Sequence, residues 1–277
     1  MGADAAVSEP GPEHRVTVAA MIDTRPLAVV TGASAGIGQE LAAILAREGH
    51  DLILVARREP ELTALATELK ERFGTDATVV PVDLAERDAA APVIEAVGAR
   101  AVEVLVNNAG FGGHGRFTSR DRDADLRMVA VNVTALTDLT KQLLPGMVEQ
   151  GRGRVLNVAS TAAFQPGPFM AVYYATKAYV LSLSQALAEE LSGSGVTVTC
   201  LCPGVTATEF QQVAGVEHIP LTKGPLSMSA RSVAEAAYRG MQRGRLLVIP
   251  GVHNKIGVHA TRFAPRRVLL KVVRRLH

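Results

Sequence analysis

The sequence predicts an α/β fold, a doubly wound parallel sheet of about seven strands with helices on both faces. Short apolar runs alternate with helical stretches from residue 27 onward, which is typical of strand–helix–strand units with right-handed crossovers. Tryptophan is absent and aromatic residues make up 4%, so the core must be aliphatic, as in buried parallel sheets. No low-complexity linker divides the chain after residue 25. We therefore expect one domain over residues 25–251.

The expected strands are short apolar runs bounded by turn residues. They are Leu27–Thr31, Leu52–Ala56, Thr78–Val82, Val102–Asn107, Arg154–Ala159, Thr197–Cys202 and Leu246–Pro250. The clearest helices, Ile37–Glu48 and Glu59–Phe73, have apolar residues every three or four positions.

Both ends of the chain differ from this pattern. Residues 1–24 lack periodicity, and we expect a flexible extension there. Residues 252–277 form a basic amphipathic segment, and the stretch from 236 to 277 holds ten Lys or Arg and no Asp or Glu. The helix expected at Pro265–His277 has one apolar face, made of Leu269, Val272, Val273 and Leu276. Such a helix can lie on an anionic membrane. Because the apolar stripe is short, packing on the domain or another subunit is favoured.

Composition narrows the function class. Cys200 and Cys202 are too close for an ordinary disulfide and do not form a metal or redox motif, so they indicate small buried residues in a cytoplasmic protein. The sequence predicts no metal site. No apolar run is long enough for a transmembrane helix, and no nucleic-acid-binding module accompanies the net charge of +2.

The first expected strand ends in Thr-Gly-Ala-Ser-Ala-Gly-Ile-Gly, residues 31–38, and a helix follows. Glycines allow a tight turn and close backbone approach to a pyrophosphate, and a helix N-terminus supplies amide donors. A glycine-rich turn can instead serve strand–helix packing alone, but this context favours phosphate binding. The expected cofactor contacts here are Gly32, Ser34, Gly36, Ile37 and Gly38.

This loop resembles the TGxxxGIG motif of the short-chain dehydrogenases/reductases. The resemblance implies a Rossmann-type fold that binds a nicotinamide dinucleotide at this edge of the sheet. It covers about residues 25 to 250 and is closest to an NADP-preferring, bacterial-type branch.

The second expected strand indicates which dinucleotide binds. An acidic residue at its end would select NAD through the ribose 2′-hydroxyl, but Ala56 stands there, followed by Arg57 and Arg58. A guanidinium suits a phosphate, so NADP(H) is favoured over NAD(H). The alternative is two solvated arginines at the start of a helix.

Three further segments resemble cofactor-contacting elements of the family. The resemblance places Asp83 and Leu84 beside the adenine, although Asp83 can equally cap a helix. It places Asn108, Ala109 and Gly110, in an Asn-Asn-Ala-Gly motif, against the adenosine ribose. It also places Pro203, Gly204 and Thr206 beside the nicotinamide, with Thr206 departing from the usual aliphatic residue.

Tyr173 and Lys177 have the spacing that puts two side chains on one face of a helix. A neighbouring ammonium lowers the pKa of a tyrosine, which would suit it to proton transfer near neutral pH. Ser160 lies thirteen residues before Tyr173, and Asn132 lies twenty-eight before Ser160. The order resembles the family's catalytic tetrad, in which the serine holds the substrate oxygen and the asparagine positions a water.

The expected substrate pocket is apolar. Its candidate lining residues are Phe111, Phe164, Phe169, Met170, Phe210 and Val213, with a covering loop at Glu209–Leu226.

We therefore expect an oxidoreductase that transfers a hydride between NADP(H) and the carbonyl or alcohol carbon of an apolar small molecule. The family resemblance implies a homodimer or homotetramer. Two alternatives stay open: a dinucleotide-binding scaffold or sensor without turnover, and a peripheral membrane reductase of a lipid carbonyl.

Overall fold

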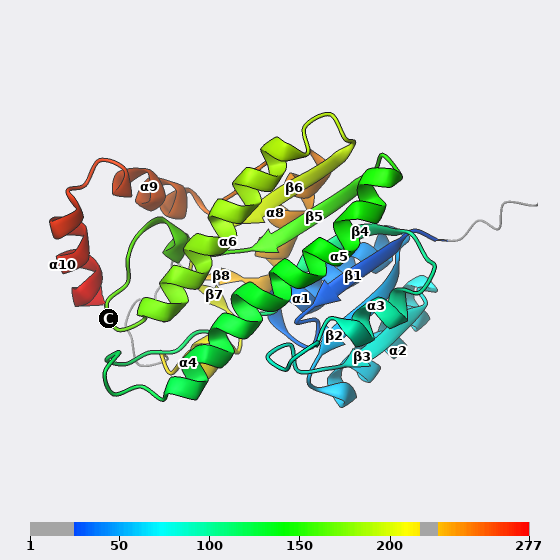
Figure 1. The fold of residues 1–277 in the computed structure, drawn as a ribbon, viewed down its shortest axis with the longest axis horizontal. Coiled ribbons are helices and arrows are strands. Elements are labelled where there is room, and N and C mark those ends of the chain that lie inside the picture. Colours follow the sequence, from blue (N-terminus) through cyan, green and yellow to red (C-terminus); the bar gives the residue numbers. More distant parts are fainter. Residues whose placement is uncertain (1–24, 217–226, 277) are drawn as a thin grey trace, which may run out of the picture.

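A parallel β-sheet forms the centre of the computed structural model, which describes residues 25–216 and 227–276 (Figure 1). Its seven strands have the order β3-β2-β1-β4-β5-β6-β9. They are β1 (Leu27–Thr31), β2 (Asp51–Ala56), β3 (Ala77–Pro81), β4 (Val102–Asn107), β5 (Gly153–Val158), β6 (Val196–Leu201) and β9 (Leu247–Val248). Strands β2 and β3 follow β1 on one side, and the chain then crosses over to place β4 on the other side of β1. The predicted doubly wound, Rossmann-type sheet is confirmed.

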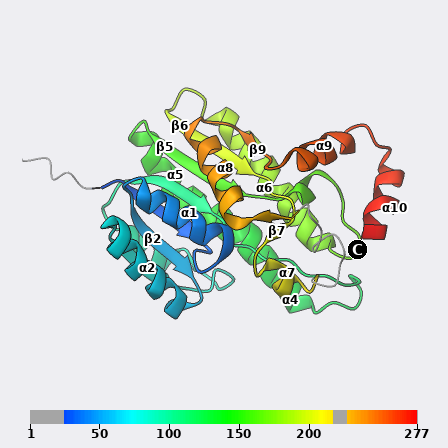
Figure 2. The ribbon, with the colours of Figure 1, turned by 180° about the vertical axis from the view of Figure 1, so that it is seen from behind.

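Helices cover both faces of the sheet (Figures 1 and 2). The described helices are α1 (Gly36–Arg47), α2 (Glu59–Phe73), α3 (Ala91–Val97), α4 (Arg122–Val129), α5 (Leu136–Glu149), α6 (Ala171–Glu190), α7 (Phe210–Ala214), α8 (Ala230–Gln242), α9 (Val252–Thr261) and α10 (Arg266–Leu276). Helices α1, α2 and α8 pack on one face, and α3, α5 and α6 pack on the other. A short ladder joins β7 (Thr206–Ala207) to β8 (Met228–Ser229).

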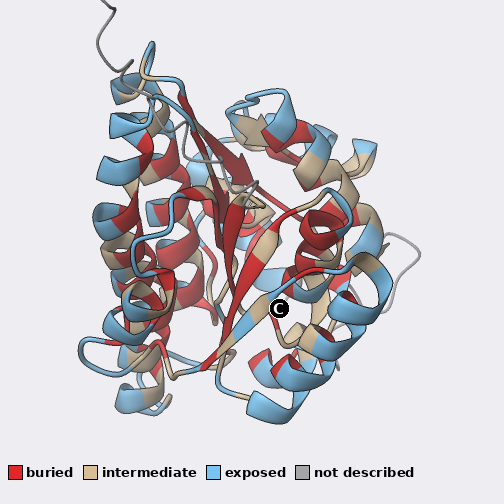
Figure 3. Cartoon of the chain, turned by 90° about the vertical axis from the view of Figure 1, so that its right-hand side faces the viewer, coloured by how far each residue is buried: buried red, intermediate tan, exposed pale blue. Residues whose placement is uncertain are grey.

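The aliphatic composition explains the two layers. In β1, Ala28 and Val30 join the core under α1, while Leu27 and Val29 join the core on the opposite face. Successive side chains of a strand point to opposite faces, so a strand buried on both sides needs an unbroken apolar run. Figure 3 shows the buried sheet between helices whose outer sides are exposed.

Buried polar side chains fix the carboxyl ends of β4 and β5. Asn107 Nδ2 donates hydrogen bonds to Asn157 Oδ1 and to Thr140 Oγ1, both at 2.9 Å. Asn157 in turn donates to Ser184 Oγ of α6 at 3.0 Å. These bonds set the register between the two strands from which functional residues emerge.

Two local features depart from the predicted elements. The strand expected at Leu246–Pro250 spans only Leu247 and Val248, although the Leu246 carbonyl oxygen also accepts from the Cys200 amide at 2.8 Å. Pro250 has no amide hydrogen with which to extend the ladder. Between α4 and α5 the helix takes one π-helical turn, Ala130–Ala135, and Asn132 lies within it. Across residues 25–216 and 227–276, no helix is long and apolar enough to cross a membrane, and no cluster of His, Cys, Asp or Glu could hold a metal ion.

Candidate active site

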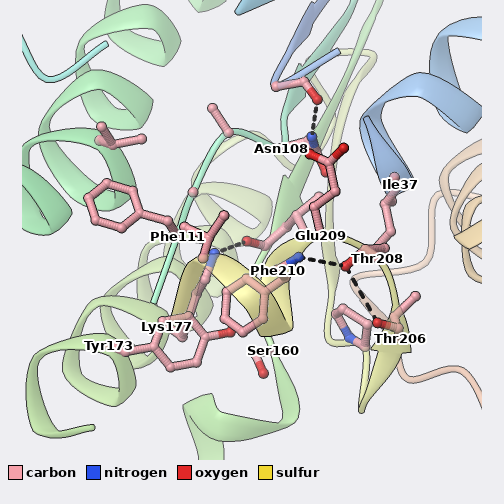
Figure 4. Close-up of a pocket in the computed structure, with 18 of the residues that line it drawn as sticks. Ile37, Asn108, Phe111, Ser160, Tyr173, Lys177, Thr206, Thr208, Glu209 and Phe210 are labelled. Atoms are coloured by element: carbon pink, nitrogen blue, oxygen red, sulfur yellow. Dashed lines mark hydrogen bonds between the residues drawn. The ribbon is translucent and has the colours of Figure 1, made fainter. Parts of the chain in front are cut away.

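A cavity of about 650 Å³ opens at the carboxyl ends of the strands (Figure 4). This is the edge where ligands bind in open α/β sheets. The cavity brings together nearly all residues predicted to contact cofactor or substrate. The predicted residues that line it are Gly32, Ser34, Gly36, Ile37, Arg57, Arg58, Asp83, Leu84, Asn108, Ala109, Gly110, Ser160, Tyr173, Lys177, Pro203, Gly204 and Thr206. Gly38 and Asn132 lie behind the wall.

The glycine loop wraps the start of α1. Gly36 has a φ of +59°, which favours a residue without a side chain. A Cβ on Gly38 would overlap the carbonyl oxygen of Gly32 and the side-chain amide of Asn108. The N-cap residue of α1, Ala35, has no side-chain acceptor, so the first amides of the helix are left for a ligand anion.

Thr31 and Asn108 tie this loop to β4. Thr31 Oγ1 accepts hydrogen bonds from the backbone amides of Asn108 and Ala109, both at 3.0 Å. Asn108 Nδ2 donates to the carbonyl oxygens of Thr31 and Gly32, at 2.9 and 3.1 Å. Asn108 thus holds the phosphate loop in place. Thr31 was not among the predicted contacts, although it precedes Gly32 in the motif.

The two arginines after β2 have different surroundings. Arg58 donates to the Ser34 carbonyl oxygen at 3.2 Å and forms an ion pair with Glu209 at 3.0 Å, so it links the phosphate loop to the segment before α7. The Arg57 side chain is 67% exposed, and its guanidinium lies 4.0 Å from Asp83.

Asp83 is held from two sides. One carboxylate oxygen accepts from the Ala85 amide at 3.0 Å, so Asp83 stabilises its own turn. The other oxygen accepts from Arg127 of α4 at 2.5 Å. No local motif signals Arg127, because it lies 44 residues along the chain from its partner.

Ser160, Tyr173 and Lys177 meet at the middle of the cavity (Figure 4). Ser160 follows β5, and the other two are one turn apart on α6. Burial raises the pKa of Tyr173 to about 12, and a hydrogen bond with Ser160 offsets only part of this effect. We expected Lys177 to lower the tyrosine pKa. In this structure burial dominates instead, and the phenol is neutral near pH 7.

Lys177 is buried and its Nζ donates to the Val158 carbonyl oxygen at 2.8 Å. Nζ lies 5.9 Å from the centroid of the Tyr173 ring. Burial lowers the pKa of Lys177 to about 8. At pH 7 the ammonium is therefore the main form, but this pH is only about one unit below its pKa.

The Asn132 side chain does not line the cavity but is bonded to residues that flank it. Its Nδ2 donates to the Phe111 carbonyl oxygen and to Thr176 Oγ1, both at 3.0 Å. Its Oδ1 accepts from the Phe111 amide at 3.1 Å. Asn132 thus fixes the loop after β4 against the turn of α6 that precedes Lys177.

The far end of the cavity is apolar. The predicted residues that line it are Phe111, Met170, Phe210 and Val213. Phe164 packs on the core and Phe169 lies beside the His114 ring at a tilt of 48°. Neither lines this cavity, so the prediction for these two rings is wrong. Val273 of α10 also lines the cavity. No sequence pattern predicted this, because Val273 is far along the chain from the other lining residues. Residues 217–226 of the expected covering loop lie outside the described residues.

Comparison with known proteins places this geometry in context. The family model described as short chain dehydrogenase matches residues 26–217. The human very-long-chain 3-oxoacyl-CoA reductase is 32% identical over 190 residues, which are 67% of this chain and 61% of that protein. The chain spans about 60% of the length of the first curated relatives it matches.

Two solved structures are similar along most of their length. A short-chain dehydrogenase from Sphingobium yanoikuyae in complex with NADPH is 36% identical, with a TM-score of 0.78, covering 88% of this chain and 95% of the other. The 3-ketoacyl-(acyl-carrier-protein) reductase from Brucella melitensis, complexed with NADH, is 30% identical, with a TM-score of 0.71, covering 82% and 98%. Similar proteins are thus seen with either nicotinamide cofactor.

Proposed function

The chain belongs to the short-chain dehydrogenase/reductase family, and on that premise we propose that it transfers a hydride between NADP(H) and the carbonyl or alcohol carbon of an apolar substrate. The observation that carries the proposal is the meeting of Ser160, Tyr173 and Lys177 on the wall of a cavity whose other end is a phosphate loop.

The cavity fits a nicotinamide dinucleotide. The uncapped first amides of α1 suit a pyrophosphate, and the tight packing at Gly38 brings the loop backbone close to it. Pro203, Gly204 and Thr206 would lie along the nicotinamide end, next to the catalytic side chains. When bound, the cofactor supplies or accepts the hydride.

Ser160, Tyr173 and Lys177 together bind and protonate the substrate oxygen. The Ser160 hydroxyl holds the substrate oxygen, and Tyr173 protonates that oxygen as negative charge develops on it. Burial raises the pKa of Tyr173, so the phenol is protonated at neutral pH and can act as the acid when a carbonyl is reduced. The Lys177 ammonium stabilises the phenolate that remains after proton transfer. Asn132 positions the surrounding backbone.

The preference for NADP(H) rests on Arg57 and Arg58. Both line the cavity beside the end of β2, whose last residue, Ala56, carries no carboxylate to accept from a ribose 2′-hydroxyl. The more exposed Arg57 is the freer of the two to bind a 2′-phosphate. Assignment to the bacterial-type branch is part of this proposal.

Titration with NADPH and NADH, followed by nicotinamide fluorescence, tests the cofactor assignment. Charge-assisted hydrogen bonds contribute about 1.5–3 kcal/mol, so Arg57→Ala should weaken NADPH binding roughly 10- to 100-fold and leave NADH binding nearly unchanged. Arg47→Ala, an arginine near the opposite end of α1, is the matched control.

The titration has three informative outcomes. Equal loss of both cofactors in Arg57→Ala would show that this arginine does not bind the 2′-phosphate. A preference of the wild-type protein for NADH would overturn the NADP(H) assignment within the same enzyme class. Cofactor binding without turnover of any ketone or alcohol would favour a scaffold or sensor.

The lining of the cavity supports an apolar substrate. Charged lining residues other than Lys177 gather at the cofactor end, and they are Arg57, Arg58, Asp83, Arg127 and Glu209. Among the described residues, the opposite end offers Phe111, Met170 and Val273 instead. Relatives named as oxoacyl reductases agree with a ketone on an apolar chain. Turnover confined to strongly anionic substrates would contradict this assignment.

We also propose a cytoplasmic homodimer or homotetramer. Both cysteines are unpaired and buried, as expected in a reducing compartment. Leu126 and Val129 of α4 and Tyr179 of α6 are exposed large side chains, which a second subunit could cover. Sedimentation velocity measures the assembly directly, and a monomer would contradict the proposal.

A further inference from the structure

Helix α9 carries an exposed apolar stripe. Val252 and Ile256 are four residues apart on one face, with exposures of 71% and 65%, and Phe263 just beyond the helix is 87% exposed. Figures 1 and 2 show α9 and α10 projecting together from one end of the molecule. Grouped exposed apolar side chains of this size are typical of surfaces that bind another protein or a membrane.

Helix α10 continues that surface and also reaches the cavity. Its Val273 lines the cavity and is 1% exposed, and Leu269, one turn earlier, is half-buried. Val268, Leu270 and Val272 flank this buried line and are exposed. Packing against the domain therefore uses only the centre of a wider apolar face.

The charge on this segment has one sign. From residue 252 to the end of the sequence there is no Asp or Glu. Its cations are Lys255, Arg262, Arg266, Arg267, Lys271, Arg274 and Arg275. Arg267, Lys271 and Arg274 follow one another at helical spacing on the side of α10 away from its apolar face. An amphipathic, cationic, acid-free surface is complementary to anionic headgroups above an apolar interior.

A second copy of the chain is a poorer occupant. A two-fold contact through α10 would bring the cations of one copy close to the cations of the other, with no carboxylate in the segment to pair them.

We propose that α9 and α10 form a docking surface for the anionic face of a lipid bilayer. The exposed side chains of Val252, Ile256 and Phe263 enter the interface, and the arginines of α10 bind headgroup phosphates and carboxylates. Because Val273 of α10 lines the cavity, docking through the opposite side of α10 brings the substrate end of the site to within one helix of the lipid surface. An apolar ketone dissolved in the membrane would reach the site there, a consequence that rests on the proposed function.

Vesicle cosedimentation of the full chain, without cofactor or substrate, tests the proposal. The probes are phosphatidylcholine vesicles with and without phosphatidylserine, at low and high salt. The double variant Ile256→Ser/Phe263→Ser removes apolar contacts, and Arg267→Gln/Arg274→Gln removes charge. Phe117→Ser is the matched control, since Phe117 is 71% exposed and lies on the loop before α4. All substituted side chains are exposed, so thermal melting should match the wild type.

The expected result is binding to phosphatidylserine-containing vesicles that weakens with salt. Each double variant should lower the partition coefficient roughly tenfold or more, and Phe117→Ser should not change it. Three results would overturn the proposal: no wild-type binding at low salt, equal binding to neutral vesicles, or binding unchanged in both double variants. A smaller particle for Ile256→Ser/Phe263→Ser in sedimentation velocity would also overturn it, because the face would then bind a second copy.

The docking and reductase proposals fail separately. Absent vesicle binding overturns the docking surface and leaves cofactor binding and turnover untouched. Absent turnover of soluble ketones overturns the reductase and leaves the binding result standing.

Discussion

The charge of Lys177 should destabilise the folded protein, and Lys177→Met should reveal by how much. The side chain is 5% exposed, and burial lowers its pKa from 10.5 to about 8. At pH 7 the amine is charged in both the folded and unfolded chain, so folding moves an ammonium out of water. Methionine has similar length and no charge.

The size of the effect follows from the pKa values. A tenfold change in acidity corresponds to about 1.4 kcal/mol, so the buried charge lowers the free energy of unfolding by about 3 kcal/mol at pH 7. Between pH 8 and 10.5 the unfolded chain binds more protons than the folded one, so wild-type stability rises with pH in this window. By pH 10 the penalty falls below about 1 kcal/mol. The lost hydrogen bond to Val158 costs the variant about 1–3 kcal/mol at every pH.

Urea unfolding of wild type and Lys177→Met between pH 7 and pH 10, without cofactor, measures how their difference in unfolding free energy depends on pH. The stability of Lys177→Met relative to wild type should fall by about 2–3 kcal/mol over that range. The hydrogen-bond contribution does not titrate and cancels from the change. Lys141→Met, on the exposed side of α5, is the control, because its ammonium stays in water in both states. A relative stability that is flat with pH would refute the argument that folding dehydrates Lys177.

Two further substitutions separate chemistry from cofactor binding. Tyr173→Phe should keep NADPH binding within about threefold of wild type and lower kcat by about 10²- to 10⁴-fold, measured with a soluble ketone; near-normal kcat would remove Tyr173 from proton transfer. Gly38→Ala should weaken NADPH binding at least about tenfold and lower Tm, because its Cβ overlaps Gly32 and Asn108. Gly146→Ala on α5, where the nearest atom to the new Cβ is 3.9 Å away, is its control, and equal behaviour of the two variants would contradict the packing argument.

Local patterns predicted most of the fold. The bounds of β1, β4 and α2 agree with the sequence-based expectation, because each element is a run of suitable residues closed by a turn. The phosphate loop and the pair on α6 are also local, so their spacing alone placed them together.

Features that depend on distant contacts were not predictable in this way. Arg127 meets Asp83, and Val273 reaches the cavity, only after the chain has folded. The pKa of Tyr173 was expected to fall because its sequence neighbour is a lysine one turn away. Burial, which depends on the whole fold, reverses that direction. The π-helical turn at Asn132 likewise has no composition signal.

The ion pair between Arg58 and Glu209 would reduce the net binding free energy of a cofactor phosphate at Arg58. The guanidinium already has a carboxylate counter-ion and a backbone acceptor at Ser34. If NADP(H) binds as proposed, a 2′-phosphate at Arg58 would replace one anion with another, and the net gain would be the difference between two similar attractions. The same replacement would break the contact between Arg58 and Glu209 at the start of the segment leading into α7. Competition for Arg58 would then couple occupancy of the adenosine end to the contact that holds the segment before α7.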